Sequence, residues 1–466
     1  MPETPHGANA ATSRPPEGEE SFGVSMDLVD AVASAIEDGR HADVEVQVAS
    51  LHAADIADLL ESLSDENRLA LVDILGSRFD AEILTHLAAP VREDVIDHLG
   101  PERLAHLLSE LDSDDAVEVF EDLDEEFQHR ILTALPQAYR QILQQSLTYP
   151  EDSAGRLMQR EVVVVPSAWT IGETIDYMRA AEDLPDDFYD LYVVNPKHRP
   201  IGKIPLSRAL RTRRPVRLTE IMETDIKAIP LTMDQEEVAH MFRQYGLVSA
   251  PVVDEAGRLV GVITVDDIVH IIEEEAEEDA LKLSGVSEGD LYSATLDTTR
   301  ARFPWLLVNL VTAIVASLVI GLFEATIQQV VALAVLMPIV ASMGGNAGTQ
   351  TLAVAVRALA TRDLTPATAL RFIGKEVLVG AANGILFAVL TGLVAALWFD
   401  NPLIGAIIGA AMIFNMIVAG LCGTLIPITL ERLGIDPAIA SSVFLTTVTD
   451  VVGFFTFLGL ASLVLL

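Results

Sequence analysis

A single carboxylate, Asp450, lies near the middle of the last apolar segment of the chain, within SSVFLTTVTDVVGFFTFLG. A charged side chain at the centre of a bilayer costs roughly 3 kcal/mol on insertion scales, so Asp450 is expected to face water, an ion or a partner. The central parts of the other apolar segments contain no Lys, Arg or His to pair with it. Thr446, Thr447 and Thr449 lie within one turn and extend a polar face. Because unpaired acids that face a pore select cations, the pattern favours an ion pathway. A protonated Asp packed between helices is the alternative.

A second polar stretch, SMGGNAGTQ (residues 342–350), follows Pro338 in an earlier apolar segment. Its glycines allow close approach of a neighbouring backbone or a locally opened helix, which survives at membrane depth only where it lines a cavity or is buried in protein. Close packing of small residues is the simpler explanation. Asn346, Thr349 and Gln350 supply neutral oxygen atoms. Carboxylate and amide oxygens suit a hard cation such as Mg²⁺. The residues alone therefore predict a pathway for a divalent cation or a proton-coupled cation.

Charge is distributed unevenly along the 466 residues. The chain has 30 Lys and Arg against 68 Asp and Glu, a net charge of −38, yet half of it is hydrophobic. After Phe303 there are five basic and seven acidic residues, so residues 1–303 hold a net charge of −36. We therefore expect an acidic soluble portion followed by an apolar one. The acid surplus argues against a nucleic-acid partner, and a single cysteine, Cys422, excludes a disulfide scaffold.

The first part of the soluble portion is expected to be a tail followed by a helical domain. Residues 1–25 have no apolar core of a signal peptide and indicate a disordered tail. Apolar residues recur at helical spacing through residues 26–150. Within this range, segments 53–63 and 101–111 match at a shift of 48 residues. The pattern predicts an all-α superhelical domain of stacked hairpins, or else an ordinary irregular helical domain.

Residues 151–272 contain an internal duplication of a β-α-β-β-α unit. The copies occupy about 155–217 and 218–272, and Gly202 of the first aligns with Gly261 of the second. The order resembles a tandem pair of CBS domains, α+β regulatory modules whose halves pack face to face. The whole chain is thus expected to be a multidomain protein.

The remaining chain reads as an acidic connecting segment, residues 273–302, and a five-helix transmembrane domain, residues 303–466. Each apolar segment reaches the ~20 residues that span a bilayer core, and the five lie at about 304–323, 328–359, 372–399, 402–430 and 437–466. The basic residues after Phe303 all fall near the second and fourth turns between these segments. The positive-inside rule then places the soluble portion in the cytoplasm and the C-terminus outside, in a multi-pass protein of the cytoplasmic membrane.

This order of domains resembles the MgtE family of magnesium channels and transporters. GGNAGTQ is similar to the family's GGNxGxQ segment, and DPAIASSVFLTTVTDVVGF to its last-helix signature. The resemblance implies a homodimer in membrane lipid, with a pore walled by the second and fifth spans. Asp450 would hold hydrated Mg²⁺ there, Thr446 falls where the family offers a backbone carbonyl, and Asn346 belongs to the pore-lining segment.

The resemblance also implies that cytosolic Mg²⁺ closes the pore. Acid clusters would repel one another until Mg²⁺ neutralises them and draws a connecting (plug) helix, at about 277–296, against the pore. Asp114 and Glu118, at i and i+4, share one helical face. By family position the sensor ligands are Asp114, Glu118, Glu236, Asp267, Glu275, Glu278, Asp279 and Asp436. Any one of them could equally be a solvated surface acid, and Asp436-Pro437 could simply start a helix.

The sequence differs from the MgtE family pattern at two places, and several alternative functions are left open. One family sensor site has acids where this chain has Gly246 and His270, so that site is expected to be lost or altered. Thr264 and Asp267 of the second copy fit a ribose-binding pattern, but the first copy has Arg208 in place of the acid, which leaves ATP or AMP binding open. The rivals are a transporter of Mn²⁺ or Co²⁺, a carrier coupled to Na⁺ or H⁺, and a membrane nucleotide sensor that transports nothing. No enzyme motif competes with them.

Overall fold

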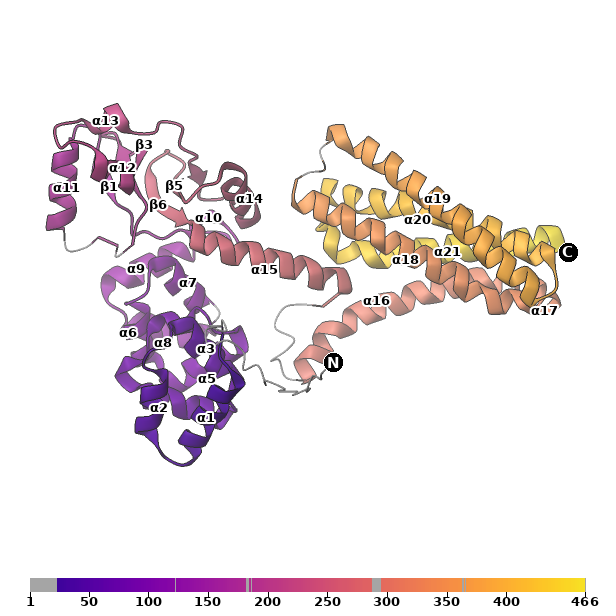
Figure 1. Cartoon of the computed structure of the whole chain (residues 1–466), viewed down its shortest axis with the longest axis horizontal. Helices are drawn as coiled ribbons and strands as arrows, with labels where there is room; N and C mark the ends of the chain where they lie inside the picture. The colour runs from indigo at the N-terminus through magenta and orange to yellow at the C-terminus, as the bar shows by residue number, and fades with distance from the viewer. Residues whose placement is uncertain are drawn as a thin grey trace, which may run out of the picture. The chain divides into compact units, whose positions relative to one another are not determined.

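The computed structural model describes residues 23–121, 123–181, 184–185, 187–286, 295–362, 364 and 366–465 (Figure 1). The chain forms two compact units. The first comprises Met1–Asp234 with Ser249–Ile263, and the second comprises Gln235–Val248 with Thr264–Leu466. Nearly all of the expected disordered tail lies outside the described residues.

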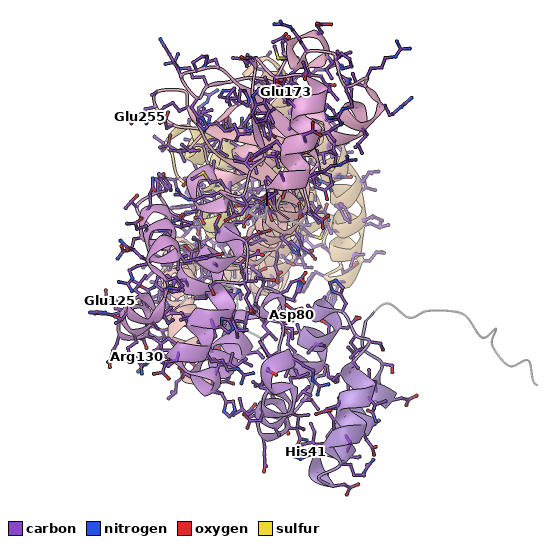
Figure 2. All side chains as sticks on the ribbon, turned by 90° about the vertical axis from the view of Figure 1, so that its left-hand side faces the viewer. His41, Asp80, Glu125, Arg130, Glu173 and Glu255 are labelled. Atoms are coloured by element: carbon purple, nitrogen blue, oxygen red, sulfur yellow. The ribbon has the colours of Figure 1, made fainter. Side chains whose placement is uncertain are left out.

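The N-terminal part of the first unit is helical. Its helices are α1 (Met26–Glu37), α2 (His41–Val48), α3 (Ala53–Ser62), α4 (Asp65–Leu75), α5 (Ala89–Leu99), α6 (Pro101–Leu108), α7 (Ser113–Glu121), α8 (Glu125–Ala134) and α9 (Gln137–Ser146), with 3₁₀ turns at Gly76–Arg78 and Ala81–Leu84. Ser64 caps α4 by accepting a hydrogen bond from the backbone N–H of Asn67. The residues that match at the shift of 48 are all buried in one core: Ala57, Leu59, Leu60, Leu63, Ala105, Leu107, Leu108 and Leu111. The repeat seen in the sequence is therefore a repeat of core positions. Charged side chains such as Asp80 and Glu125 stand on the surface of this unit (Figure 2).

The duplicated region forms two three-stranded sheets, in agreement with the predicted duplication of a β-α-β-β-α unit. The first copy consists of α10 (Ala154–Leu157), β1 (Val164–Pro166), α11 (Ile171–Ala180), β2 (Asp190–Val194), β3 (Pro200–Pro205) and α12 (Leu206–Arg211). The second consists of α13 (Leu218–Ile221), β4 (Ile229–Pro230), α14 (Gln235–Tyr245), β5 (Ser249–Val253), β6 (Leu259–Thr264) and the start of α15 (Val265–Ser284). The sheet orders are β1-β2-β3 and β4-β5-β6. In each sheet the first two strands are parallel, which places the intervening helix as a crossover.

Each copy pairs its leading segment with the last strand of the other copy. Gln159 exchanges backbone hydrogen bonds with Val262 at 2.9 Å in both directions, and Lys203 does the same with Glu223 at 3.0 and 2.8 Å. Gly202 and Gly261 permit this approach: a Cβ atom at Gly202 would lie 2.8 Å from the carbonyl oxygen of Glu223, and one at Gly261 would lie 2.7 Å from that of Gln159. The two glycines that aligned in the sequence thus serve the same contact.

Helix α15 begins in the second copy of the duplicated unit and continues through the acidic run. Thr264 and Asp267 form a capping box at its start, and Gly285, at φ 69°, ends it in the left-handed conformation. We expected a connecting helix at about 277–296, but α15 ends at Ser284. The helix contains no Gly or Pro between its apolar first turns and the acidic run that follows them. The domain boundary expected at residue 273 therefore lies inside one helix. Residues 287–294 are outside the described part of the chain.

The part of the second unit from α16 onward, residues 295–465, forms the membrane unit. Among the described residues it contains five helices long and apolar enough to cross a bilayer. They are α16 (Thr295–Gly321), α18 (Ala332–Ala360), α19 (Pro366–Trp398), α20 (Pro402–Arg432) and α21 (Pro437–Leu465). A short helix, α17 (Glu324–Gln329), precedes α18, so the segment expected at 328–359 is divided where Val330 leaves the helical conformation. Helix α20 is the most buried of the five and packs against α18, α19 and α21 (Figure 1). Glycines allow the closest of these contacts: a Cβ atom at Gly420 would lie 2.7 Å from the carbonyl oxygen of Glu376 in α19.

Candidate ion pathway and its acidic surroundings

Asp450 lies near the midpoint of α21 and is half-buried within its own chain. Among the described residues its carboxylate has no hydrogen bond or ion pair, whereas Thr446, Thr447 and Thr449, within the preceding turn, each make a hydrogen bond. A carboxylate at this depth without a protein partner is stabilised only by water, by a cation or by protonation. The position is therefore the strongest candidate for an ion site in the membrane unit.

The threonines beside Asp450 direct their hydroxyl hydrogens to their own helix. Thr446 Oγ1 donates to the carbonyl oxygen of Ser442 at 3.0 Å, and Thr447 Oγ1 donates to that of Val443 at 2.6 Å. The fully buried Thr449 donates to the carbonyl oxygen of Thr446 at 3.0 Å. The Thr446 carbonyl expected to face the pathway thus already accepts a side-chain hydrogen bond. A hydroxyl that donates to its helix keeps its lone pairs for an incoming donor such as a hydrated ion.

Helix α18 is continuous through SMGGNAGTQ, so the locally opened helix that was one of our two expectations is wrong. The other, close approach, is confirmed at two of the three glycines. A Cβ atom at Gly348 would lie 3.0 Å from the side chain of Leu445 in α21, and Gly344 meets Asn415 of α20; no atom lies within 4 Å at Gly345. The opposite face of α18 carries exposed polar side chains, namely Ser342, Asn346, Thr349 and Gln350. Asn346 is near the midpoint of the helix, and its Nδ2 donates to Ser342 Oγ at 3.4 Å.

The sensor acids predicted in the N-terminal domain lie on α7. Asp114 is half-buried in its first turn, and Glu118 is exposed. Arg92 of α5 donates to Glu118 Oε1 at 2.8 Å. The Arg92 side chain is 8% exposed, so this guanidinium already supplies Glu118 with a counter-charge.

The acids predicted around α14 and α15 take different roles. Gln235 Nε2 donates to Glu275 Oε1 at 2.8 Å, and Glu236 follows Gln235 in the first turn of α14. Asp267 accepts from Thr264 Oγ1 at 2.9 Å. Burial raises the pKa of Asp267 to about 6, although the bonds from Thr264 oppose the shift. The residues of the ribose-binding pattern, Thr264 and Asp267, are therefore engaged in capping α15.

Arg208 is also engaged in the first CBS copy. Its guanidinium forms an ion pair with Glu223 at 2.7 Å and donates to the carbonyl oxygen of Ile221 at 3.1 Å. The sequence placed Arg208 where a ribose-binding acid would stand. In the structure it ties α12 to the start of the second copy, at the end of α13.

A lysine that the sequence analysis did not single out lies among the remaining predicted sensor acids. Lys282 donates to Glu278, one turn earlier in α15, and to Oδ2 of Asp436 at 3.1 Å. These bonds raise the pKa of Lys282 against the opposing effect of burial. Burial and the nearby Asp436 raise the pKa of Asp279. Asp436 Oδ1 also accepts from the backbone N–H of Ala438 at 2.7 Å, so Asp436 caps the start of α21.

A regulatory divalent cation would need several carboxylates that converge on one point. Carboxylates suit Mg²⁺, but no group of three or more Asp, Glu, His or Cys side chains converges as a metal site among the described residues. Two of the predicted ligands, Glu278 and Asp436, share the Lys282 ammonium instead. The described side chains therefore do not form a ready coordination sphere.

The sequence analysis also did not identify Glu376 and Asn415, two buried polar residues of the membrane unit. Glu376 of α19 accepts from Thr351 Oγ1 of α18 at 3.2 Å, and Asn415 of α20 is fully buried. Each is a single polar residue within an apolar segment, and the sequence gives no other indication that it is buried. Their partners lie 25 and 75 residues away, so the contacts are not visible from local spacing.

The chain has five candidate membrane spans, with a carboxylate and an amide at the midpoints of two of them. An acidic helical domain and a duplicated α+β region precede the spans. This arrangement defines a multi-pass membrane protein of the ion-transport class. Family models match residues 337–460 as the MgtE divalent cation transporter, 51–152 as the MgtE intracellular N domain and 218–274 as a CBS domain. The chain belongs to the MgtE family.

Individual relatives cover almost the whole chain. The magnesium transporter MgtE of Thermus thermophilus is 33% identical over 445 residues, which is 94% of this chain and 98% of the relative. The magnesium transporter MgtE of Bacillus subtilis is 28% identical over 441 residues, covering 94% and 97%. A solved structure of the cytosolic domain of the Mg²⁺ channel MgtE in complex with ATP is 31% identical, covers 52% of this chain and 99% of that chain, and has a TM-score of 0.49.

Proposed function

We propose that the protein is a magnesium-selective channel or transporter for Mg²⁺ uptake across the cytoplasmic membrane. The observation that carries the proposal is Asp450, a mid-membrane carboxylate with no protein partner among the described residues. The relatives named as magnesium transporters support Mg²⁺ as the substrate. Mg²⁺ gives up its water reluctantly, so the carboxylate and the amide of Asn346 would act on the hydrated ion through its water molecules.

The polar face of α18 supports a homodimer. Ser342, Asn346, Thr349 and Gln350 are exposed in the single chain although they lie in the central part of a membrane-spanning helix. Such side chains are disfavoured against lipid tails and face protein or water. A second copy of the chain would cover them and would enclose an aqueous pathway between the α18 and α21 helices of both copies.

Orientation follows from the basic side chains. Arg362 lies in the α18–α19 turn, Arg357 lies in the last turn of α18, and Arg371 and Lys375 lie in the first three turns of α19. Arg432 lies at the end of α20. These two turns are on one side of five alternating spans, which would be the cytoplasmic side, with the C-terminus outside.

Regulation by cytosolic Mg²⁺ belongs to the same proposal and rests on charge. Residues 1–303 hold a net charge of −36, so neutralisation by a cation would favour closer packing of the acidic parts. Because the described acids form no ready three-ligand site, no coordination is assigned to any one of them.

Reconstitution tests the function directly. The full-length protein in proteoliposomes is expected to take up Mg²⁺ at a rate set by the membrane potential and independent of Na⁺ and H⁺ gradients. A dependence on either gradient would identify a coupled carrier, and faster uptake of Mn²⁺ or Co²⁺ would identify a different substrate. Uptake no faster than in empty vesicles would overturn the proposal in favour of a nucleotide sensor.

A further inference from the structure

Asn415 is a fully buried amide in the middle of α20, the central helix of the membrane unit. Its Nδ2 donates to the backbone carbonyl oxygen of Val340 in α18 at 3.0 Å. Its Oδ1 is buried and accepts no hydrogen bond among the described residues. An apolar side chain would fill the same position without leaving a polar atom unsatisfied, so packing alone does not account for an amide here.

The Asn415 side chain occupies notches that two glycines leave open. A Cβ atom at Gly344 of α18 would overlap Nδ2 and would lie 2.9 Å from Cγ. A Cβ atom at Gly453 of α21 would lie 2.8 Å from Nδ2 and 3.4 Å from Cγ1 of Val340. One side chain of α20 therefore meets α18 and α21 at the point where the two helices approach each other.

These contacts lie beside the two residues proposed for the ion pathway. Gly344 is two residues before Asn346, and Gly453 is one turn after Asp450. Because a helix moves as a nearly rigid rod over such short distances, the width of this junction sets how Asn346 and Asp450 stand relative to each other.

We propose that Asn415 is a positioning residue of the ion pathway, which holds α18 and α21 at the separation that the selectivity of the pathway requires. The inference rests on the proposed function. Asn415 does not touch the ion; it acts through the two helices that carry Asn346 and Asp450. The first glycine of GGNAGTQ is then required for the Asn415 amide, while the second, Gly345, is not.

The test moves side-chain volume from position 415 to position 344 by substitution. Gly344→Ala adds a methyl group where the amide lies, and Asn415→Ala removes the amide. Gly374→Ala in α19 is the control, because the same substitution there meets no atom within 4 Å and leaves the GGNAGTQ segment unchanged. Mg²⁺ and Co²⁺ uptake are measured in proteoliposomes, and their ratio is compared because it does not depend on the amount of folded protein.

Each single variant is expected to lower the ratio of Mg²⁺ to Co²⁺ uptake about fivefold or more, and the double variant is expected to return within about twofold of wild type, since the methyl group takes the space of the amide. Gly374→Ala is expected to keep the wild-type ratio. Should Gly344→Ala fail to fold, Asn415→Leu removes the bond to Val340 without a substitution in α18, and the same change of ratio is expected.

The possible failures are distinguishable. Wild-type uptake at the level of empty vesicles would overturn the proposed function and this inference with it. Wild-type uptake together with unchanged ratios in Gly344→Ala, Asn415→Ala and Asn415→Leu would overturn the inference alone. A double variant no better than the worse single variant would also contradict it.

Discussion

Lys282 Nζ lies 3.1 Å from Oδ2 of Asp436, so the last turn of α15 is tied to the residue that precedes α21. Leu283, the next residue, packs against a buried cluster that includes Leu352 of α18 and Leu445 of α21. An ammonium and an apolar contact thus hold the end of α15 on the helices that carry the proposed pathway. This tie requires no metal ion, whereas carboxylates alone would repel one another.

Lys282→Gln is expected to weaken this tie. The variant loses the ion pairs with Glu278 and Asp436, so the docked position of α15 should lose about 0.7–1.4 kcal/mol, the scale of a partly buried ion pair. If the docked helix restricts the pathway, Mg²⁺ uptake at low cytosolic Mg²⁺ should rise three- to tenfold. Uptake into proteoliposomes with buffered internal Mg²⁺ measures this, and Lys197→Gln removes the same charge from an exposed loop as a control. Equal uptake by both variants would show that Lys282 does not hold the helix against the pathway.

A buried ion pair in the first CBS copy predicts a much larger effect on stability. Lys203 Nζ lies 2.8 Å from Oδ2 of Asp190, whose side chain is 5% exposed. Lys203→Met leaves a buried carboxylate without its cation and should cost about 3–5 kcal/mol. Addition of Asp190→Asn, which keeps an acceptor for Ser249, should recover part of that loss. Hydrogen exchange of the β2 and β3 amides gives the opening free energies.

The matched control for Lys203 is Lys227→Met, which breaks an ion pair with Asp225, whose side chain is 88% exposed. Exposed pairs contribute about 0–1 kcal/mol. A loss at Lys203 no larger than at Lys227 would contradict the view that burial makes the first pair structural.

The capping box of α11 predicts a dependence on pH. Glu173 accepts from the backbone N–H and the hydroxyl of Thr170 at 2.7 and 2.8 Å, and the backbone bond, followed by the hydroxyl bond, lowers the pKa of Glu173. A depressed folded-state pKa adds stability above the unfolded value and loses it as the pH falls through the folded value. Glu173→Ala should therefore speed exchange of the α11 amides at pH 7, with a difference from wild type that shrinks toward pH 3.5. Glu220→Ala, an exposed acid in α13, is the control. A difference that grows on acidification would contradict the assignment.

Periodicity predicted the layout of the chain because it depends on residue types at regular spacing. The five apolar segments, the repeated core positions of α3 and α6, and the duplication marked by Gly202 and Gly261 could all be seen in this way. The end of the acidic helix could not, because the helix continues through charged residues until Gly285.

Contacts between distant residues explain most of what was missed. Arg92 reaches Glu118 across 26 residues, and Asn415 reaches Val340 across 75. No local pattern marks such partners, so an acid with a buried counter-charge looks the same in the sequence as one free to bind a cation. Asp450 was identifiable because the cost of a charge in an apolar span depends on its own position alone.

The central claim is that Asp450 faces the ion pathway, and a single substitution tests it. Asp450→Asn keeps the shape of the side chain and removes its charge, while Glu431→Gln makes the same change at an exposed acid near the end of α20. With both proteins reconstituted at equal density, Mg²⁺ uptake by Asp450→Asn is expected to fall at least tenfold, or to lose its preference over Mn²⁺ and Co²⁺, and Glu431→Gln is expected to match wild type. Unchanged Mg²⁺ uptake and selectivity in Asp450→Asn would contradict the account.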